Sequence, residues 1–195
     1  MMPENIKRTE YIVNLRGRIE NLTSLEKLLL SVMFAGLTGI AAHVKIYLPF
    51  TPVPITLQTL VVMLSGIIIG YYGALSQVIY ALLGILGVPW FAYGGGTSYI
   101  VSPTFGYILG FIAASTFLAE TISRRPNISF VGIISVLVLA NAIIYFCGVT
   151  WLYAYLNVVS KATIWDAMLL GVIPFVPGDV IKILIAASVA RLLRK

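Results

Sequence analysis

Long apolar runs separated by short polar breaks occupy most of this chain after a polar N-terminal segment. A helix needs about 20 mostly apolar residues to cross the hydrocarbon core of a bilayer. Six runs approach that length, and they lie at Leu25–Leu48, Thr56–Tyr72, Gly73–Trp90, Thr104–Ser123, Phe130–Tyr153 and Pro174–Leu193. The pattern therefore predicts an all-α integral membrane protein in which residues 25–195 form a compact bundle of six transmembrane helices.

Two of the connections between these runs predict local structure. Only Gly70–Gly73 separates the second run from the third, and so short a turn implies an antiparallel helical hairpin. Residues 160–172 are apolar but are interrupted by Lys161 and Asp166. We interpret them as an interfacial or connecting helix that precedes the sixth span.

A basic segment, residues 1–24, precedes the first span. Within it, Tyr11, Leu15, Ile19 and Leu22 recur at helical spacing, which predicts an amphipathic helix on the cytoplasmic membrane surface. A solvated helical tail without a specific role is the alternative. The long polar stretch before the first apolar block is not typical of a cleavable signal peptide.

Composition agrees with a membrane protein and excludes an ordinary soluble domain. Hydrophobic residues make up 59% of the chain, charged residues make up 10%, and the mean hydropathy is +0.99. In a typical soluble domain about 25% of the residues are charged. No Asp, Glu, Lys or Arg occurs from Ile46 to Ala119, so this stretch has no ionic groups with which to build a water-facing surface.

The net charge of +6 does not indicate a nucleic-acid-binding protein, because the basic residues form no patch within one predicted face. Most of them lie near the N-terminus, at Arg124 and Arg125, or at the C-terminus. Only Lys45 and Lys161 fall in connections on the opposite side. Under the positive-inside rule, this distribution places both termini in the cytoplasm and the chain in the cell membrane.

The chain holds few residues that support metal binding or catalysis. Cys147 and His43 are the single residues of their types, so neither a disulfide nor a Cys- or His-based metal cluster can be built within one chain. No Gly-rich loop continues into the Lys-Ser or Lys-Thr that binds ATP phosphates. We therefore expect no metal, no cofactor and no enzymatic activity.

Most of the unusual sequence lies in the three connections that this topology assigns to the outer side. The first contains Pro49, Pro52 and Pro54, which favour an extended backbone and block a helix. The second contains the triple glycine Gly94–Gly96, and the third ends in the Pro-Gly-Asp sequence at residues 177–179. Candidate ligand-binding residues therefore gather on the outer side.

Asp179 and Lys182 are oppositely charged residues inside the sixth predicted span. Three positions apart on a helix, they project to the same side, with a rise of about 4.5 Å between them. Ionisable groups at membrane depth are costly and usually face a partner or a cavity. We predict that the pair binds a ligand, and a salt bridge with a purely structural role is the alternative.

Uncharged polar residues provide further candidates for a ligand site. In the helices they are Asn141, Tyr107, Tyr145, Thr56, Gln58 and Gln77. The loop adds Thr97 and Ser98, together with the glycines Gly94, Gly95 and Gly96. For the residues in helices, the alternative is an interhelical hydrogen bond within the chain. For the glycines, which let a backbone approach a ligand closely, the alternative is a flexible turn.

Small residues in the first span form a ridge on one face of the predicted helix. Ser31, Ala35 and Gly39 lie four positions apart, a spacing that lets another helix approach closely. The ridge is a candidate docking site for a partner subunit, and packing against a neighbouring span of the same chain is the alternative.

Together these motifs resemble the BioY family, the biotin-specific substrate-capture (S) components of energy-coupling factor (ECF) transporters. The resemblance extends from about Phe34 to the C-terminus. It is carried by Pro52–Gln58, by Gly94–Gly96 running into Pro103–Phe111, by Ile144–Gly148 with Trp151 and Leu152, and by Pro174–Lys182. The sequence departs from the family's pattern at Phe105, where Gly is frequent, and at Thr150, where Pro is common.

The resemblance implies a bundle of six helices with a pocket near the outer face, and biotin as a ligand rather than a cofactor. It also implies a transmembrane coupling subunit that docks on the small-residue ridge, and two cytoplasmic ATPases. On this interpretation, Asp179 accepts a hydrogen bond from the ureido N–H of biotin, and Lys182 meets its carboxylate or another polar edge. The placement of ring and tail stays open.

Three other functions stay open beside biotin capture. The first is capture of another small vitamin by the same architecture. The second is an intramembrane enzyme that uses Asp179 and Lys182 as acid and base, although no supporting His, Ser or metal cluster accompanies them. The third is a membrane scaffold that binds no ligand.

Overall fold

The computed structural model describes residues 21–125 and 128–193. In chain order the elements are α2 (Ser24–His43), β1 (Lys45–Ile46), β2 (Ile55–Thr56), α3 (Gln58–Ile68), α4 (Tyr71–Ile85), the 3-10 helix η1 (Thr97–Val101), α5 (Phe105–Arg124), α6 (Phe130–Ser160), α7 (Ile164–Gly171) and α8 (Val176–Leu192). The chain is mostly helical, as predicted. The amphipathic segment predicted at residues 1–24 falls almost wholly outside the described residues.

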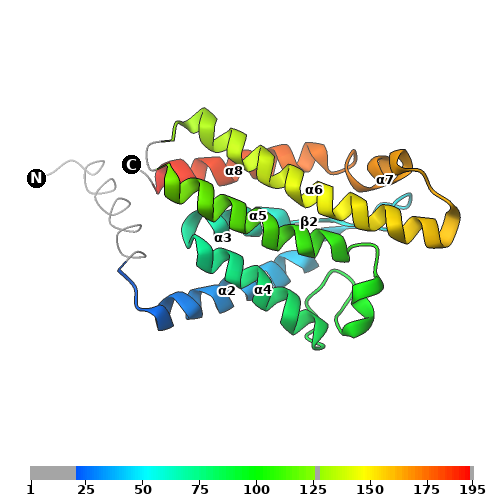
Figure 1. Ribbon diagram of the computed structural model, residues 1–195, viewed down its shortest axis with the longest axis horizontal. Coiled ribbons are helices and arrows are strands. Elements are labelled where there is room, and N and C mark those ends of the chain that lie inside the picture. Colours follow the sequence, from blue (N-terminus) through cyan, green and yellow to red (C-terminus); the bar gives the residue numbers. More distant parts are fainter. Residues whose placement is uncertain (1–20, 126–127, 194–195) are drawn as a thin grey trace, which may run out of the picture.

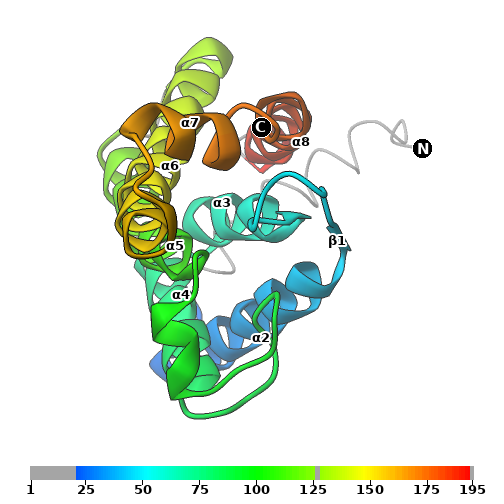
Figure 2. The same ribbon diagram turned by 90° about the vertical axis from the view of Figure 1, so that its right-hand side faces the viewer.

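The helices pack side by side into an elongated bundle (Figure 1). Seen along the bundle, α3 lies at the centre, and it contacts α2, α4, α5, α6 and α8 (Figure 2). Val62 and Met63 of α3 are completely buried by these neighbours. The apolar residues of this short helix therefore form the middle of the core.

Several of the helices are able to cross a membrane. Among the described residues, α2, α5 and α6 are long and apolar enough by themselves, with mean hydropathies of 1.6, 1.5 and 2.4. The pair α7 and α8 satisfies the same criterion as one span bent by 56°. These helices indicate a multi-pass membrane protein.

The second and third predicted spans are longer than the helices that form there. α3 has 11 residues and α4 has 15, fewer than the roughly 20 that a full crossing needs. The apolar runs at Thr56–Tyr72 and Gly73–Trp90 therefore include residues that are not helical. Hydropathy alone identifies apolar residues but does not show whether they are helical.

The chain between α2 and α3 is extended, and it takes the place of a longer helix. β1 and β2 pair antiparallel, with Lys45 opposite Thr56. Pro52 and Pro54 lie just before β2, and proline disrupts a helix because it lacks an N–H and its ring clashes with the preceding turn. Helix α3 therefore begins only at Gln58.

The predicted hairpin between α3 and α4 is confirmed. Gly70 precedes α4 with a φ of +56°, a left-handed conformation that favours glycine. A Cβ on Gly73 would lie 2.3 Å from the carbonyl oxygen of Ser65, so the two helices pass too closely for any side chain there. Glycine is thus required both for the turn and for the packing that follows.

The helix predicted within residues 160–172 is also present. α7 begins after Thr163, whose side chain accepts a hydrogen bond from the Asp166 N–H while the Asp166 carboxylate accepts one from the Thr163 N–H. This reciprocal capping satisfies two of the free N–H groups at the start of the helix. α7 connects α6 with α8 (Figure 1).

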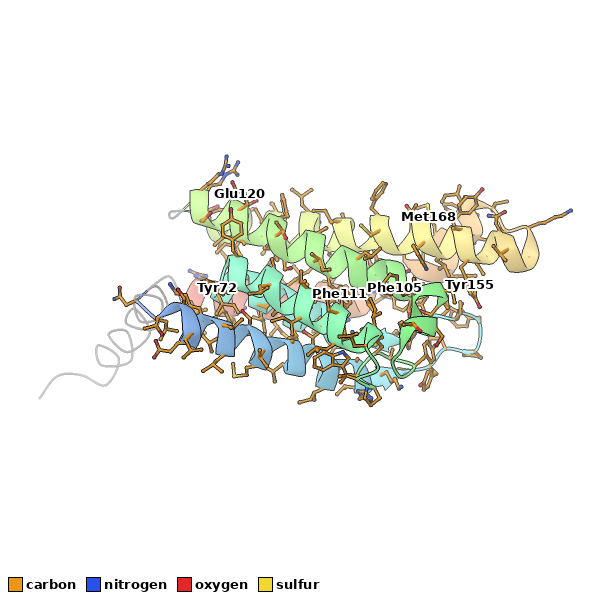
Figure 3. All side chains as sticks on the ribbon, turned by 60° about the horizontal axis from the view of Figure 1, so that its bottom comes forward. Tyr72, Phe105, Phe111, Glu120, Tyr155 and Met168 are labelled. Carbon is orange, nitrogen blue, oxygen red and sulfur yellow. The ribbon has the colours of Figure 1, made fainter. Side chains whose placement is uncertain are left out.

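The long connections gather at one end of the bundle, opposite the start of α2 and the end of α8 (Figure 1). We call this the loop end, and it comprises residues 44–57, residues 86–104 and α7. Figure 3 shows Phe105, Tyr155 and Met168 toward the loop end, and Tyr72 and Glu120 toward the opposite end. The three connections predicted on the outer side therefore share one end of the molecule.

Candidate ligand-binding site

Two oppositely charged side chains are buried at the start of α8. Proline is tolerated in the first turn of a helix, and Pro177 occupies that place here. Asp179 and Lys182 follow three positions apart, with the Lys182 Nζ 2.7 Å from the Asp179 Oδ1. Their exposures are 3% and 6%. The pair forms a buried salt bridge, so its surroundings decide whether it also serves a ligand.

The carboxylate of Asp179 accepts four hydrogen bonds. Its Oδ1 accepts from Lys182 at 2.7 Å and from the Thr59 hydroxyl at 3.3 Å. Its Oδ2 accepts from the Asn141 amide at 3.2 Å and from the Tyr145 hydroxyl at 2.5 Å. A carboxylate has about four lone-pair sites. Asp179 thus joins α3, α6 and α8, and a further donor must displace one of these four.

Two groups beside the salt bridge keep unused hydrogen-bonding capacity. The Lys182 ammonium has three N–H donors, of which one goes to Asp179 and one to the Thr59 hydroxyl at 3.1 Å. The buried Oδ1 of Asn141 accepts no hydrogen bond from any described residue. Buried polar atoms without partners are rare in proteins. One N–H of Lys182 and the Oδ1 of Asn141 therefore have no hydrogen-bond partner among the described residues.

The salt bridge lines a cavity at the loop end. The apolar wall comes from Val53, Pro54, Ala92, Ile108, Phe111, Ile144 and Phe175. The polar lining comes from Thr56, Gln58, Thr59, Tyr80, Tyr99, Thr104, Tyr107 and Tyr145, together with Asp179 and Lys182. A mostly apolar space with one buried ionic group suits a small ligand that has both apolar and polar parts.

One side of the cavity is fixed by hydrogen bonds between side chains and backbone. The Gln58 amide donates to the Tyr80 hydroxyl at 2.8 Å, and that hydroxyl donates to the Trp90 carbonyl at 3.2 Å. The indole N–H of Trp90 returns a bond to the Tyr80 carbonyl at 2.9 Å. These contacts hold α3, α4 and the following loop in one arrangement.

A second network lies where the extended segment 44–57 meets the loop after α4. The Lys45 ammonium donates to the Ala92 carbonyl and lies 5.2 Å from the ring centre of Tyr47 and 5.9 Å from that of Tyr93. The Tyr93 hydroxyl donates to the Pro52 carbonyl at 2.9 Å. Burial, assisted by neighbouring tyrosines, raises the pKa of Tyr93, so this hydroxyl is protonated at neutral pH.

Helix α7 is attached to the cavity wall from the other side. The Thr51 hydroxyl donates to the Leu170 carbonyl at 2.7 Å. The Tyr107 hydroxyl donates to the Gly171 carbonyl at 2.8 Å. Both acceptors lie in the last turn of α7, so the end of that helix is held against the extended segment and α5.

No cluster of His, Cys, Asp and Glu that could hold a metal ion is found in residues 21–125 and 128–193. The polar groups of the cavity are hydroxyls, one amide and one ion pair, groups of the kind that hydrogen-bond to organic ligands.

The profile of the BioY family matches residues 14–195, nearly the whole chain. The chain belongs to the BioY family. The resemblance seen in the sequence motifs is thereby confirmed. Proteins named as BioY transporters are also similar to this chain over two thirds or more of their own length.

The biotin transporter BioY of Thermotoga maritima is 36% identical, over 88% of this chain and 97% of its own. The probable biotin transporter BioY of Lysinibacillus sphaericus is 35% identical over 86% of each chain. The probable biotin transporter BioY of Methanothermobacter thermautotrophicus is 37% identical, over 66% of this chain and 85% of its own.

The BioY fold is also seen in a solved structure. A crystal structure of the S-component for biotin from an ECF-type ABC transporter superposes with a TM-score of 0.77. The match covers 89% of this chain and 95% of the other, at 23% sequence identity. The two chains therefore share a fold.

In this BioY chain the cavity brings together about half of the ligand-binding residues predicted from the sequence. Asp179, Lys182, Tyr107, Thr56 and Gln58 line it. Asn141 is not part of the lining, but it hydrogen-bonds to Asp179 from behind. Tyr145, another polar candidate, lines the cavity and donates to the same carboxylate.

The predicted loop residues Gly94, Gly95, Gly96, Thr97 and Ser98 do not line the cavity. Gly94 and Gly96 have φ of +112° and +104°, and the Gly96 N–H donates to the Gly84 carbonyl at 2.8 Å. The glycines thus fold the loop against the end of α4. Ala92, before the glycines, and Tyr99 and Thr104, after them, are the residues of segment 86–104 that line the cavity.

The small-residue ridge of α2 faces the inside of this BioY chain, which corrects its prediction as a docking surface. Ser31 and Ala35 are completely buried, and the Ser31 hydroxyl donates to the Tyr72 carbonyl at 2.8 Å. A Cβ on Gly39 would lie 2.9 Å from the Trp90 Cβ. The ridge therefore serves the alternative role, close packing against α4 and the loop that follows it.

Thr59, Tyr99 and Thr104 also line the cavity and were not predicted from the sequence. The Thr59 hydroxyl touches both members of the salt bridge, and the Tyr99 hydroxyl shares a 2.8 Å hydrogen bond with Thr104. Thr59 is one position after Gln58 in an apolar run, and only its place on the first turn of α3 distinguishes it. Gln77, by contrast, hydrogen-bonds to Thr38 and Ser65, which fits the interhelical alternative.

Proposed function

We propose that this chain is the biotin-capture component of an ECF transporter, and that it binds biotin in the cavity at the loop end. The buried salt bridge of Asp179 and Lys182 carries the proposal, because it places the only charged groups among the described lining residues in a cavity whose other walls are apolar side chains, hydroxyls and one amide. Membership of the BioY family and relatives named biotin transporters support the choice of biotin.

The two ends of biotin suit different parts of the cavity. The free N–H of Lys182 donates to the ureido carbonyl, and a ureido N–H donates to Asp179. Because Asp179 already accepts four hydrogen bonds, a ureido N–H replaces a hydroxyl, either Thr59 or Tyr145. The thiophane ring and the alkyl chain pack on the apolar wall.

The proposed topology has six transmembrane helices, with the loop end at the outer face of the cell membrane and both termini in the cytoplasm. Arg124 ends α5 and Arg191 lies in the last turn of α8, and both helices end away from the loop end (Figure 1). The positive-inside rule assigns such an end to the cytoplasm. Biotin therefore reaches the cavity from outside the cell.

Transport against a gradient requires an energy source that this sequence does not encode as a phosphate-binding loop. We propose that a transmembrane coupling subunit and two cytoplasmic ATPases provide it. The chain itself performs no chemical step, and the ligand leaves it unchanged.

Isothermal titration of the purified chain tests the proposal. We expect biotin to bind, and thiamine and riboflavin not to bind. Asp179→Asn and Lys182→Met should each weaken biotin binding by at least about tenfold, because each removes a charged hydrogen-bonding partner. Glu120→Gln is the matched control, since Glu120 pairs with Arg124 toward the opposite end.

Four outcomes contradict the proposal or one of its parts. Unchanged biotin affinity in both variants refutes the assignment of the site. Tighter binding of another vitamin refutes biotin as the ligand, and recovery of chemically altered biotin refutes a purely binding role. A melting temperature that biotin does not raise supports a ligand-free scaffold, because selective binding to the folded state must stabilise it.

A further inference from the structure

The charge of the cavity does not match the charge of biotin, on which this inference depends through the proposed function. A carboxylic acid ionises with a pKa of about 4, so biotin is an anion at neutral pH. Among the described residues that line the cavity, Asp179 and Lys182 alone are charged, and their charges cancel. A bound anion therefore needs a cation from outside the lining, since a buried unpaired charge is strongly unfavourable.

Lys45 is a cation at the edge of the cavity. It lies in β1 directly opposite Thr56, and directly opposed residues project to the same face of an antiparallel pair. Thr56 lines the cavity, and so does Ala92, whose carbonyl accepts a hydrogen bond from the Lys45 ammonium. The ammonium thus lies where β1 and the loop after α4 meet at the cavity wall (Figure 2 views this end).

The charge of Lys45 has no carboxylate to neutralise it in residues 21–125 and 128–193. Its contacts are one backbone carbonyl and the faces of Tyr47 and Tyr93. Carbonyls and aromatic faces attract a cation but carry no net charge. An ammonium has three donors, and one of them is used. The Lys45 ammonium therefore keeps its positive charge and two N–H donors available to bind an anion.

The aromatic neighbours hold the ammonium in place without covering it. The Tyr93 hydroxyl is bound to the Pro52 carbonyl, which fixes the ring beside Lys45. Tyr47 and Tyr93 are 57% and 47% exposed, so the site is open toward the loop end. A positioned cation at the opening loses less entropy on binding an anion than a free lysine side chain does.

We propose that Lys45 binds the carboxylate of biotin and thereby sets the preference of the site for an anionic ligand. The Asp179–Lys182 pair then binds the ureido ring, and the alkyl chain spans the apolar wall between the two polar ends. This assigns the tail of the ligand to the opening and its ring to the interior. The competing role for Lys45 is to fasten the loop after α4 to β1.

Titration of ligand pairs that differ in charge separates the two roles. Wild type, Lys45→Gln and Lys45→Arg are titrated with biotin and with biotin methyl ester, which lacks the negative charge. Gln keeps a donor for the Ala92 carbonyl but removes the charge, and Arg keeps both. We expect Lys45→Gln to weaken biotin binding by about ten- to hundredfold and ester binding by less than about threefold.

Lys45→Arg should bind biotin like wild type, and so should Lys161→Met, the matched control. Lys161 is an exposed lysine at the C-terminal end of α6, outside the cavity. If Lys45→Gln weakens binding of acid and ester equally, or of neither, the carboxylate role of Lys45 is refuted. A charge-dependent loss in Lys182→Met but not in Lys45→Gln refutes it too and assigns the carboxylate to Lys182. If wild type binds neither ligand, the proposed function itself fails.

Discussion

Removing both charges of the buried salt bridge should harm the fold less than removing either one. In Lys182→Met, the Asp179 carboxylate loses its 2.7 Å partner but remains 4% exposed, with only neutral donors from Thr59, Asn141 and Tyr145. In Asp179→Asn, the ammonium loses its anionic partner and keeps only neutral acceptors, the Thr59 hydroxyl and the new amide oxygen.

The expected magnitudes follow from this geometry. Breaking a buried ion pair by removing one partner costs about 3 to 5 kcal/mol, because the remaining charge is unpaired. The hydroxyl and amide donors around Asp179 offset part of this loss, so Lys182→Met should be near the lower value. The double variant Asp179→Asn/Lys182→Met leaves no charge to bury. The double variant should therefore lose less than about 3 kcal/mol of unfolding free energy, which is less than either single variant loses.

Thermal unfolding of the four proteins in one detergent, without biotin, measures this coupling. The double variant should melt at a higher temperature than either single variant. If the two single losses of stability instead add, the double variant will be the least stable of the four proteins. That result would refute the idea that an isolated buried charge causes most of the loss. Glu120→Gln again serves as control, because an exposed pair contributes about 0 to 1 kcal/mol.

Two further predictions concern packing and the attachment of α7. Gly84→Ala places a Cβ 2.0 Å from the Phe91 ring and should lower stability by about 1 to 3 kcal/mol, whereas Gly36→Ala meets nothing within 4 Å and should raise it by up to about 1 kcal/mol. Equal melting temperatures for these variants would contradict the packing. Tyr107→Phe removes the donor to the Gly171 carbonyl and should cost about 1 to 3 kcal/mol. Hydrogen exchange of α7 amides should accelerate in that variant, and unchanged exchange would show that this bond does not hold α7.

The sequence predicted the charged centre of the site because ionic residues at membrane depth are rare. Asp179 and Lys182 lie in one apolar span and Asn141 lies in another. Their polarity within these spans was enough to identify them as candidates. Hydroxyl residues do not stand out in this way. Thr59 and Tyr99 belong to residue types that occur throughout the chain, and only the fold shows which of them point into the cavity.

Helix positions were predictable from apolar runs, but the use of small residues was not. A glycine indicates that the backbone can turn there or pack closely against another segment. It does not indicate which segment or ligand lies beside it. Gly94–Gly96 therefore suggested a ligand contact, although these residues shape a turn against α4. Ser31 and Gly39 likewise suggested a contact between subunits, although their close neighbours are Tyr72 and Trp90 of the same chain.

The prolines before α3 also determine the balance of donors and acceptors in the cavity wall. Each backbone position in a membrane interior must find partners for its polar groups, and proline contributes a carbonyl without an N–H. Pro49, Pro52 and Pro54 thus leave segment 44–57 with more acceptors than donors. Such a wall attracts donors, as the Tyr93 hydroxyl on the Pro52 carbonyl illustrates, and repels anions. If Lys45 binds an anionic ligand as proposed, that ligand competes with the Ala92 carbonyl for the ammonium, so its affinity depends on how weakly this carbonyl holds Lys45.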